Sequence, residues 1–305
     1  MILPVEEIKK AVGAENLLTG EPLSRHTSFH IGGECTIALP RSPEAFAELF
    51  SLSKRLGFPV FVLGNGTNVL ASDDGWDGLV IKTKGLSKIG INGNTVTAGG
   101  GALLSRTAVA AAAAGLSGLE FAHGIPGSVG GAVAMNAGAY GGEMSSVVRR
   151  TLCITPGGNT VTLSGADHHF AYRHSAVIEN PGTVVLETEI ELTPGNREDI
   201  EETMRALAAK RKASQPLELP SAGSVFKRPQ GHFVGAMVQE LGLKGRTVGG
   251  AQVSEKHAGF IVNVGGATAA DVLDLIGIVR SEVQKAFGVC LECEIRPLGL
   301  GREEI

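Results

Sequence analysis

Apolar residues along the chain follow two spacings, and the two together predict a mixture of strands and helices. Short apolar runs or alternating patterns predict strands over residues 35–39, 60–63, 79–82, 89–91, 95–98, 147–155, 160–163, 184–193, 260–264 and 289–296. Amphipathic stretches predict helices over residues 4–12, 42–57, 102–114, 197–212, 234–241 and 269–287. This order, which contains no internal repeat, predicts an α+β protein.

Two of these helices carry clear boundary signals. Ser42-Pro43-Glu44 supplies an N-cap, a residue suited to the first turn and an acidic group, and Gly57 can end that helix in a left-handed conformation. Thr268-Ala-Ala-Asp271 has the pattern of a capping box, and Gly288 follows the same helix as its stop. The ends of both helices are therefore predicted closely.

The pattern changes near Thr193-Pro194-Gly195-Asn196, where a β-rich region gives way to a charged helix. We place a domain boundary there, with a first domain over 1–195, in two lobes of roughly 1–75 and 76–195, and a second over 196–305. In the last predicted strand, period two puts Glu292, Glu294 and Arg296 on one face. Charged residues repeated in this way line either solvent or a cleft.

Size and composition agree with this division. The chain has 305 residues and a mass of 31.5 kDa, which favours two domains, and 43% of its residues are apolar. The net charge of −4 argues against nucleic acid or an anionic membrane surface as the main partner. The longest apolar stretch, around 108–116, is short, and the N-terminus lacks the order of a signal peptide. We expect a cytoplasmic monomer.

The four cysteines are too sparse for a disulfide framework. Cys290 and Cys293 match C-x-x-C, but no second pair completes a zinc site, so we expect no metal. Glycine is the unusual component, at 43 residues, about twice the average usage. Because glycine lets backbone approach a ligand closely, this enrichment indicates a large bound molecule.

The first glycine-rich segment follows the strand at 60–63. Its glycines can expose successive backbone N–H groups to a phosphate pair, as in an anion-binding nest. Val69 stands where a Rossmann fingerprint has its third glycine, so that fold is excluded, and a simple tight turn is the alternative. The residues predicted here to bind a cofactor are Gly64, Asn65, Gly66, Thr67 and Asn68.

A second glycine-rich segment spans 124–142 and is too long for a simple connection. Its small residues would let backbone lie against a flat ring system, and Ser128 and Asn136 could bond to the polar edge of that ring. Two such segments indicate a large dinucleotide. The residues predicted here to bind it are Gly124, Ile125, Pro126, Gly127, Ser128, Gly131, Asn136 and Gly138.

Five motifs, taken in their order along the chain, point to one protein family. They are Gly64-Asn-Gly-Thr-Asn-Val-Leu70, Gly124-Ile-Pro-Gly-Ser-Val-Gly-Gly131, Tyr172-Arg-His-Ser175, Ala222-Gly-Ser-Val-Phe-Lys227 and Leu291-Glu-Cys-Glu-Ile-Arg296. From about His26 to its C-terminus the chain resembles the UDP-N-acetylenolpyruvoylglucosamine reductase family. The resemblance implies an FAD-binding domain of the vanillyl-alcohol-oxidase (PCMH) type followed by a smaller α+β substrate-binding domain.

The resemblance also implies an activity, the reduction of UDP-N-acetylglucosamine enolpyruvate to UDP-N-acetylmuramate in peptidoglycan precursor synthesis. NADPH would reduce a non-covalently bound FAD, and the flavin would pass hydride to the enolpyruvyl double bond. Hydride addition leaves negative charge on the neighbouring carbon and its carboxylate, which then needs a proton and electrostatic support.

By the same resemblance, three residues are catalytic. Ser224 would donate the proton, Arg173 would stabilise the developing enolate, and Glu294 would act beside them. An ionised Glu294 would repel an enolate, so we expect it to be protonated or neutralised by Arg173 or Arg296. Glu292 shares its predicted facing and is the competing assignment.

The resemblance further implies a set of substrate-binding residues, namely Tyr172, Lys227, Arg228 and Arg296. Some family members carry asparagine at the position of Arg228. Only Pro181-Gly182 separates the stretch after Tyr172 from the next strand, and Tyr140 is the only other tyrosine. The chain therefore looks like the short type, which lacks an inserted tyrosine-bearing loop.

Three alternatives stay open at this stage. An FAD-dependent oxidase of a small alcohol or sugar would keep the glycine segments and could attach its flavin covalently through His26, His30 or His123. A flavin- or nucleotide-sensing module would need no catalytic residues. A serine acyl-enzyme would use an S-x-x-K pair, present at 224–227 and at 51–54, but neither K-T-G nor S-D-N accompanies either pair.

Overall fold

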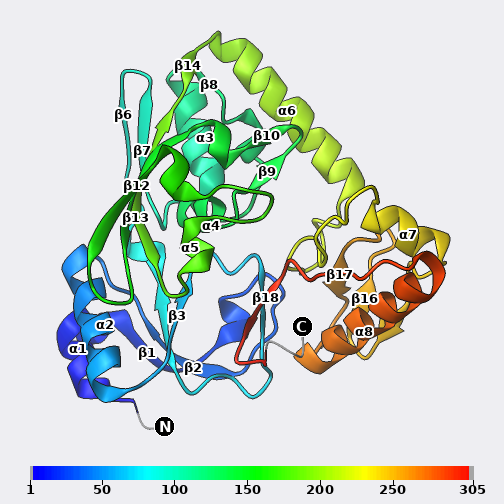
Figure 1. Ribbon diagram of the computed structural model, residues 1–305, viewed down its shortest axis with the longest axis horizontal. Helices are drawn as coiled ribbons and strands as arrows, with labels where there is room; N and C mark the ends of the chain where they lie inside the picture. Colours follow the sequence, from blue (N-terminus) through cyan, green and yellow to red (C-terminus); the bar gives the residue numbers. More distant parts are fainter. Residues whose placement is uncertain (1–2, 302–305) are drawn as a thin grey trace. The chain divides into compact units, whose positions relative to one another are not determined.

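The computed structural model describes residues 3–301 and divides into two compact units that are interleaved along the chain (Figure 1). Unit 1 takes in the described residues of 1–19, Thr36–Asn65 and Asp77–Arg211, and unit 2 takes in Gly20–Cys35, Gly66–Trp76 and the described residues of 212–305. The linear division predicted at 195/196 does not include this interleaving. Two short segments from the first quarter of the chain join unit 2, and the last crossing lies at 211/212.

The first sheet has the strand order β1-β2-β5-β3. Strands β2, β5 and β3 run parallel, as expected of buried apolar strands joined through helix α2. The α1 and α2 helices lie side by side in Figure 1, and side chains from both enter a common core that includes Ile8, Phe46 and Leu49. The bounds are α1 Val5–Val12, β1 Leu17–Pro22, β2 Glu34–Ala38, α2 Pro43–Leu56, β3 Val60–Leu63 and β5 Leu79–Lys82.

A second sheet in unit 1 has the order β12-β11-β13-β7-β6 and is antiparallel throughout. Its strands confirm the alternating pattern, because β13 buries every second residue over most of its length and exposes Glu187, Glu189 and Glu191 to different degrees. Helices α3 and α4 pack in the core beside it. The bounds are β6 Ile89–Asn92, β7 Thr95–Gly99, α3 Leu104–Ala113, α4 Val129–Ala134, β11 Val148–Ile154, β12 Thr160–Ser164 and β13 Val184–Glu191.

Short elements complete unit 1. They are the strands β8 Leu116–Ser117, β9 Gly138–Ala139, β10 Gly142–Glu143 and β14 Thr193–Pro194, helix α5 Ala176–Glu179, and the 3₁₀ helices Ala14–Asn16, Thr83–Gly85, Glu120–Ala122, Met144–Ser146 and Gly165–His168. The segment 124–142, predicted to be a loop, thus contains α4, β9 and part of β10. The predicted charged helix is α6 Arg197–Ser214, which contains the last crossing between the units.

Unit 2 packs two helices against a three-stranded antiparallel sheet of order β15-β16-β17. Its second β element is a two-stranded parallel sheet of β4 and β18, in which Val69 lies opposite Arg296. This pair explains the interleaving, since it ties a segment near residue 70 to the end of the chain. The bounds are β4 Val69–Ala71, α7 Val234–Glu240, β15 Thr247–Val248, β16 Ala251–Val253, β17 Ile261–Asn263, α8 Ala269–Phe287, β18 Arg296–Leu298 and a 3₁₀ helix, Leu23–Arg25.

The predicted helix boundaries are confirmed. The Ser42 hydroxyl accepts a hydrogen bond from the Ala45 N–H, and Gly57 has φ +74°. The capping box of α8 forms through Thr268 and Asp271, and Gly288 ends the helix at φ +68°. These local signals are reliable because each bond joins residues three or four positions apart.

The prediction of a final strand over residues 289–296 is wrong for most of that range. Only Arg296–Leu298 forms a strand there, and Cys293 makes an isolated bridge with Phe226. The alternating pattern is present, but the partner backbone is short because Ser224 turns to pair with Phe260 instead. Across residues 3–301, no helix combines the length and apolar character needed to cross a membrane.

Candidate functional site

The turn after β3 packs against the second glycine-rich segment, a contact that the sequence analysis did not predict. A Cβ at Gly64 would lie 2.5 Å from the Ser128 hydroxyl, and the Asn65 amide donates to the Pro126 carbonyl at 2.6 Å. Side chains larger than hydrogen at position 64 would push the two segments apart. The structure therefore brings Gly64, Asn65, Pro126 and Ser128 together within unit 1.

The second segment is held by backbone bonds to a third run of glycines, Gly99-Gly100-Gly101, which the sequence reasoning did not single out. Gly130 donates to the Gly100 carbonyl at 2.8 Å, and Leu104 donates to the Gly127 carbonyl at 3.0 Å. A Cβ at Gly100 or Gly101 would overlap a neighbouring backbone carbonyl. Three successive glycines after a predicted strand were the signal that could have identified this contact.

Ser128 and Asn136 serve mainly to hold the second segment in shape. The Ser128 hydroxyl caps α4 by accepting from the Gly131 N–H. Asn136 is 1% exposed, with φ +39°; its side chain accepts from the Ser145 N–H at 2.9 Å and donates to the Ala171 carbonyl at 3.2 Å. Asn136 thereby joins the glycine segment to the turn that carries Arg173.

That turn is short and closed by mutual backbone hydrogen bonds between Ala171 and His174, at 3.2 and 3.1 Å. Arg173 has φ +55°, an unusual conformation for a residue with a side chain. Tyr172 is 53% exposed, and the Arg173 guanidinium lies 5.1 Å from the centre of its ring. The turn presents a cation and a phenol together.

Two buried nitrogens flank Gly124 and have no hydrogen-bond partner among the described residues: Nδ1 of His123 and Nε of Arg211. The Arg211 side chain runs past Gly124, with its Cδ 3.1 Å from the position of a Cβ there. Burial lowers the pKa of Arg211, while Tyr140 acts in the opposite direction. The Nε–H of Arg211 is always a donor, whereas Nδ1 of His123 is a donor or an acceptor according to its tautomer. A buried donor without a partner is costly, so the surroundings of Arg211 Nε are a candidate place for a polar or anionic ligand. The sequence reasoning missed Arg211.

In unit 2, the remaining residues of the first glycine segment are tied to the C-terminal segment. The Asn68 amide donates to the Glu294 carbonyl at 3.1 Å, and the Arg296 N–H donates to the Asn68 carbonyl at 3.0 Å. A Cβ at Gly66, where φ is +69°, would overlap the His26 carbonyl. Thr67 lies between these two fixed positions. The backbone of Glu294 is thus bonded directly to Asn68, one of the predicted cofactor-binding residues, within unit 2.

The segment that carries Ser224 runs alongside the segment that carries Glu294. The Glu294 N–H donates to the Val225 carbonyl at 2.7 Å, and the Lys227 N–H donates to the Glu292 carbonyl at 2.9 Å. Lys227 also forms an ion pair with the Glu292 carboxylate at 3.2 Å. Glu292 and Glu294 compete for the same predicted catalytic role. The side chain of Glu292 is 76% exposed and is already paired with Lys227, which argues against its having that role. Arg228 stacks on Phe233, 4.2 Å from the ring centre.

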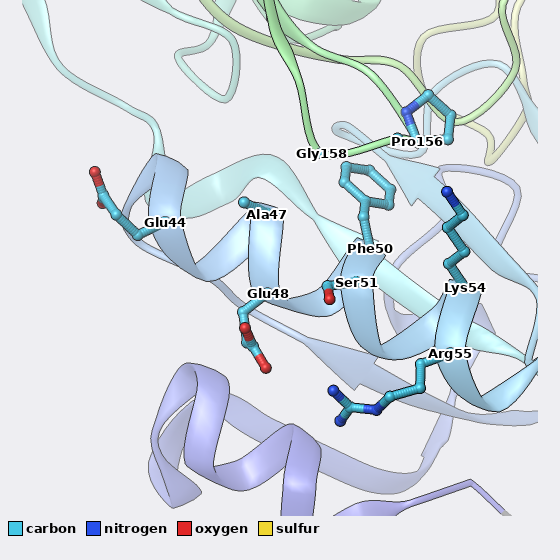
Figure 2. A pocket seen from close by; sticks show the side chains of 10 residues that line it. Glu44, Ala47, Glu48, Phe50, Ser51, Lys54, Arg55, Pro156 and Gly158 are labelled. Carbon is cyan, nitrogen blue, oxygen red and sulfur yellow. The ribbon is translucent and has the colours of Figure 1, made fainter.

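One hollow, with a volume of about 800 Å³, lies elsewhere in unit 1 and contains none of the predicted site residues (Figure 2). It lies between α2 and the turn that joins β11 to β12. Ser51 and Lys54, one of the two S-x-x-K pairs, line it together with Pro156. No group of three or more His, Cys, Asp or Glu suited to a metal was found in residues 3–301.

Comparison with known proteins identifies both parts of the chain. Residues 36–164 match the family profile described as an FAD binding domain, and residues 215–298 match that of the UDP-N-acetylenolpyruvoylglucosamine reductase C-terminal domain. The predicted class, a mixed helix and strand FAD-binding domain followed by a smaller C-terminal domain, is confirmed.

Full-length relatives agree. The UDP-N-acetylenolpyruvoylglucosamine reductase of Latilactobacillus sakei is 47% identical over 300 residues, which cover 98% of this chain and 99% of the relative. That of Agathobacter rectalis is 46% identical over 308 residues, covering 97% and 98%. The crystal structure of the Thermus caldophilus enzyme superposes with a TM-score of 0.79 at 35% identity, over 91% of this chain and 97% of that one.

The Gly66 contact gives a first prediction. Gly66→Ala should abolish FAD binding or leave it at least about tenfold weaker, because the Cβ would displace backbone at His26 and open the turn. Gly242→Ala is the matched control, since Gly242 has φ +67° in the same unit but open space around its Cβ position. Flavin absorbance after gel filtration measures the bound cofactor. Equal flavin content in the two variants would contradict the placement.

The unpaired Nε of Arg211 gives a second prediction. In FAD-free protein, Arg211→Met should raise the free energy of unfolding by about 1 kcal/mol, because it removes a buried donor without a partner. Arg205→Met, which removes an exposed arginine from the same helix, should change it by less than about 0.5 kcal/mol. Urea unfolding followed by circular dichroism compares the two. A loss of stability in Arg211→Met would show that the guanidinium is satisfied within the protein.

Proposed function

The chain belongs to the UDP-N-acetylenolpyruvoylglucosamine reductase family, and we propose that it reduces the enolpyruvyl group of UDP-N-acetylglucosamine enolpyruvate with FAD as its cofactor and NADPH as reductant. The product is UDP-N-acetylmuramate, a precursor of peptidoglycan. The observation that carries the proposal is the neighbouring placement of the Ser224 and Glu294 backbones, joined by the 2.7 Å bond from Glu294 to Val225. The alternative of an oxidase of small alcohols gains no support from the relatives.

The residues present fit FAD. The glycine turn at 64–68 offers backbone N–H groups to the diphosphate, and the second segment, over 124–138, offers small residues to a flat ring. The unpaired Nε of Arg211 supplies a donor beside Gly124, and the unpaired Nδ1 of His123 supplies a donor or an acceptor according to its tautomer. When bound, FAD supplies the hydride that the enolpyruvyl double bond receives. Asn136 contributes by holding its segment, since both polar groups of its side chain have protein partners.

We assign to Ser224 the role of the proton donor that completes the reduction. Hydride addition to one carbon of the double bond leaves an electron pair on the carbon next to the carboxylate, and the Ser224 O–H donates its proton there. A hydroxyl is a weak acid, so its position must be fixed. The bridge to Phe260 and the bond from Val225 N–H to the Gly259 carbonyl, at 3.0 Å, fix the backbone on both sides.

Arg173 and Glu294 handle the charge that develops during this step. Arg173 pairs with the substrate carboxylate as negative charge spreads into it, a task suited to a planar guanidinium that stays ionised. Glu294 acts in its protonated form, or paired with an arginine, so that it does not repel the enolate. Because Lys227 engages Glu292, we assign this role to Glu294.

Tyr172, Lys227, Arg228 and Arg296 bind the diphosphate and carboxylate of the substrate in this proposal. Lys227 would exchange its exposed partner Glu292 for a phosphate oxygen. The chain passes from α5 to β13 through a short turn at Asn180, which accepts from the Thr183 N–H, so the inserted loop of the longer family members is absent here. We further propose a cytoplasmic monomer, in keeping with a nucleotide-linked substrate and the net charge of −4.

Ser224→Ala tests the mechanism. We expect it to bind FAD and to be reduced by NADPH at the wild-type rate, while reoxidation by the enolpyruvyl sugar nucleotide slows by about 100-fold or more, because the proton donor is missing. Anaerobic stopped-flow absorbance measures the two half-reactions separately. Ser224→Cys, which retains an acidic proton, should recover part of the second rate. Loss of FAD, or an unchanged second half-reaction, would overturn the assignment.

A further inference from the structure

The segment from His168 to Glu179 holds the Tyr172-Arg173 turn between two buried anchors, all within unit 1. On the near side, Nε2 of His168 bonds to the Thr151 hydroxyl at 3.0 Å, and both residues are almost fully buried. On the far side, the fully buried Ser175 donates from its hydroxyl to the Ala134 carbonyl at 2.7 Å. Between these anchors the chain emerges to the surface.

The exposed part of this segment is conformationally strained. His169 has φ +49° and Arg173 has φ +55°, and neither position has the glycine that such values favour. Conformations of this kind are energetically unfavourable and persist only where surrounding contacts impose them. Strain at Arg173 is notable because the position of its guanidinium decides how it meets the substrate carboxylate.

Glu179 supplies contacts that close the strained part. One carboxylate oxygen bonds to Nδ1 of His169 at 2.8 Å, and the other bonds to Nε2 of His174 at 2.8 Å. The two histidines stand on opposite sides of the Tyr172-Arg173 turn. Glu179 itself is fixed at the end of α5, where its N–H donates to the Ser175 carbonyl at 3.2 Å. A single carboxylate therefore joins the start of the turn to its end.

We propose that Glu179 is a positioning residue for the reductase reaction, which holds Arg173 in its working conformation by bridging His169 and His174. The inference rests on the proposed function of Arg173. Glu179 contacts neither the substrate nor the cofactor in this account, and it acts only through the geometry of the turn. The hydrogen bonds from His174 and His169 also lower the pKa of Glu179, so the carboxylate stays ionised at neutral pH.

A purely structural role would look different. The side chain of Glu179 is 37% exposed, and its histidines are 57% and 40% exposed, so this bridge adds little to global stability. The effect of losing it should therefore appear in the step that uses Arg173. Glu201 is a matched control, because its side chain is also 37% exposed and also meets two basic partners, Arg197 and Arg205.

The experiment compares the two half-reactions of Glu179→Ala, Glu201→Ala and wild type by anaerobic stopped-flow absorbance. In Glu179→Ala, reduction of the flavin by NADPH should match wild type, while reoxidation by the enolpyruvyl sugar nucleotide should fall by about tenfold through a misplaced Arg173. Glu201→Ala should match wild type in both steps. Glu179→Gln, which can still bridge both rings through its amide, should keep at least about half of the second rate.

Equal second rates in Glu179→Ala and Glu201→Ala would overturn the proposal, and so would a Glu179→Gln variant as slow as Glu179→Ala. Equal loss of both half-reactions, or loss of flavin, in Glu179→Ala would assign Glu179 to the general fold and also reject the proposal. Failure of the proposed function is distinguishable, because wild-type enzyme would then not be reoxidised by the enolpyruvyl sugar nucleotide at all.

Discussion

The parallel pairing of β4 with β18 is the interaction on which the unit 2 part of the site depends. It places Val69 opposite Arg296, and it lets Asn68 bond to the backbone on both sides of Ile295. The first glycine segment begins in unit 1, at Gly64, and ends in unit 2, so the turn assigned to the FAD diphosphate is also the covalent passage between the units. Without this pair, the backbone of Glu294 would not be held against Asn68 within unit 2.

Four glycines of the candidate site are required by close packing of the chain. At Gly64, Gly66, Gly100 and Gly101, a Cβ would meet a backbone carbonyl or a fixed hydroxyl at less than normal contact distance. These residues let separate segments approach until their backbones bond directly, which leaves other N–H groups and small side chains to face a ligand. Glycine thus acts here first on the protein's own packing, and the binding of a large dinucleotide depends on that packing.

Local signals in the sequence predicted the helices well, because caps such as Ser42 and Thr268 act over three or four residues. Motif resemblance brought out Ser224, Arg173 and Glu294. Contacts between distant segments could not be predicted in this way. The strand over 289–296 fails because its partner segment is short, since Ser224 pairs with Phe260 instead. The roles of Arg211 and Glu179 appear only when Gly124 and the two histidines are seen beside them.

The visible spectrum of the purified protein tests the central claim most directly. Flavin bands should be present; they should bleach with NADPH under anaerobic conditions and return when UDP-N-acetylglucosamine enolpyruvate is added. That sequence of changes would establish hydride transfer from NADPH through FAD to the enolpyruvyl group. Bleached flavin that stays reduced with this substrate would contradict the reductase account, and protein refolded with added FAD that shows no flavin bands would contradict the cofactor site itself.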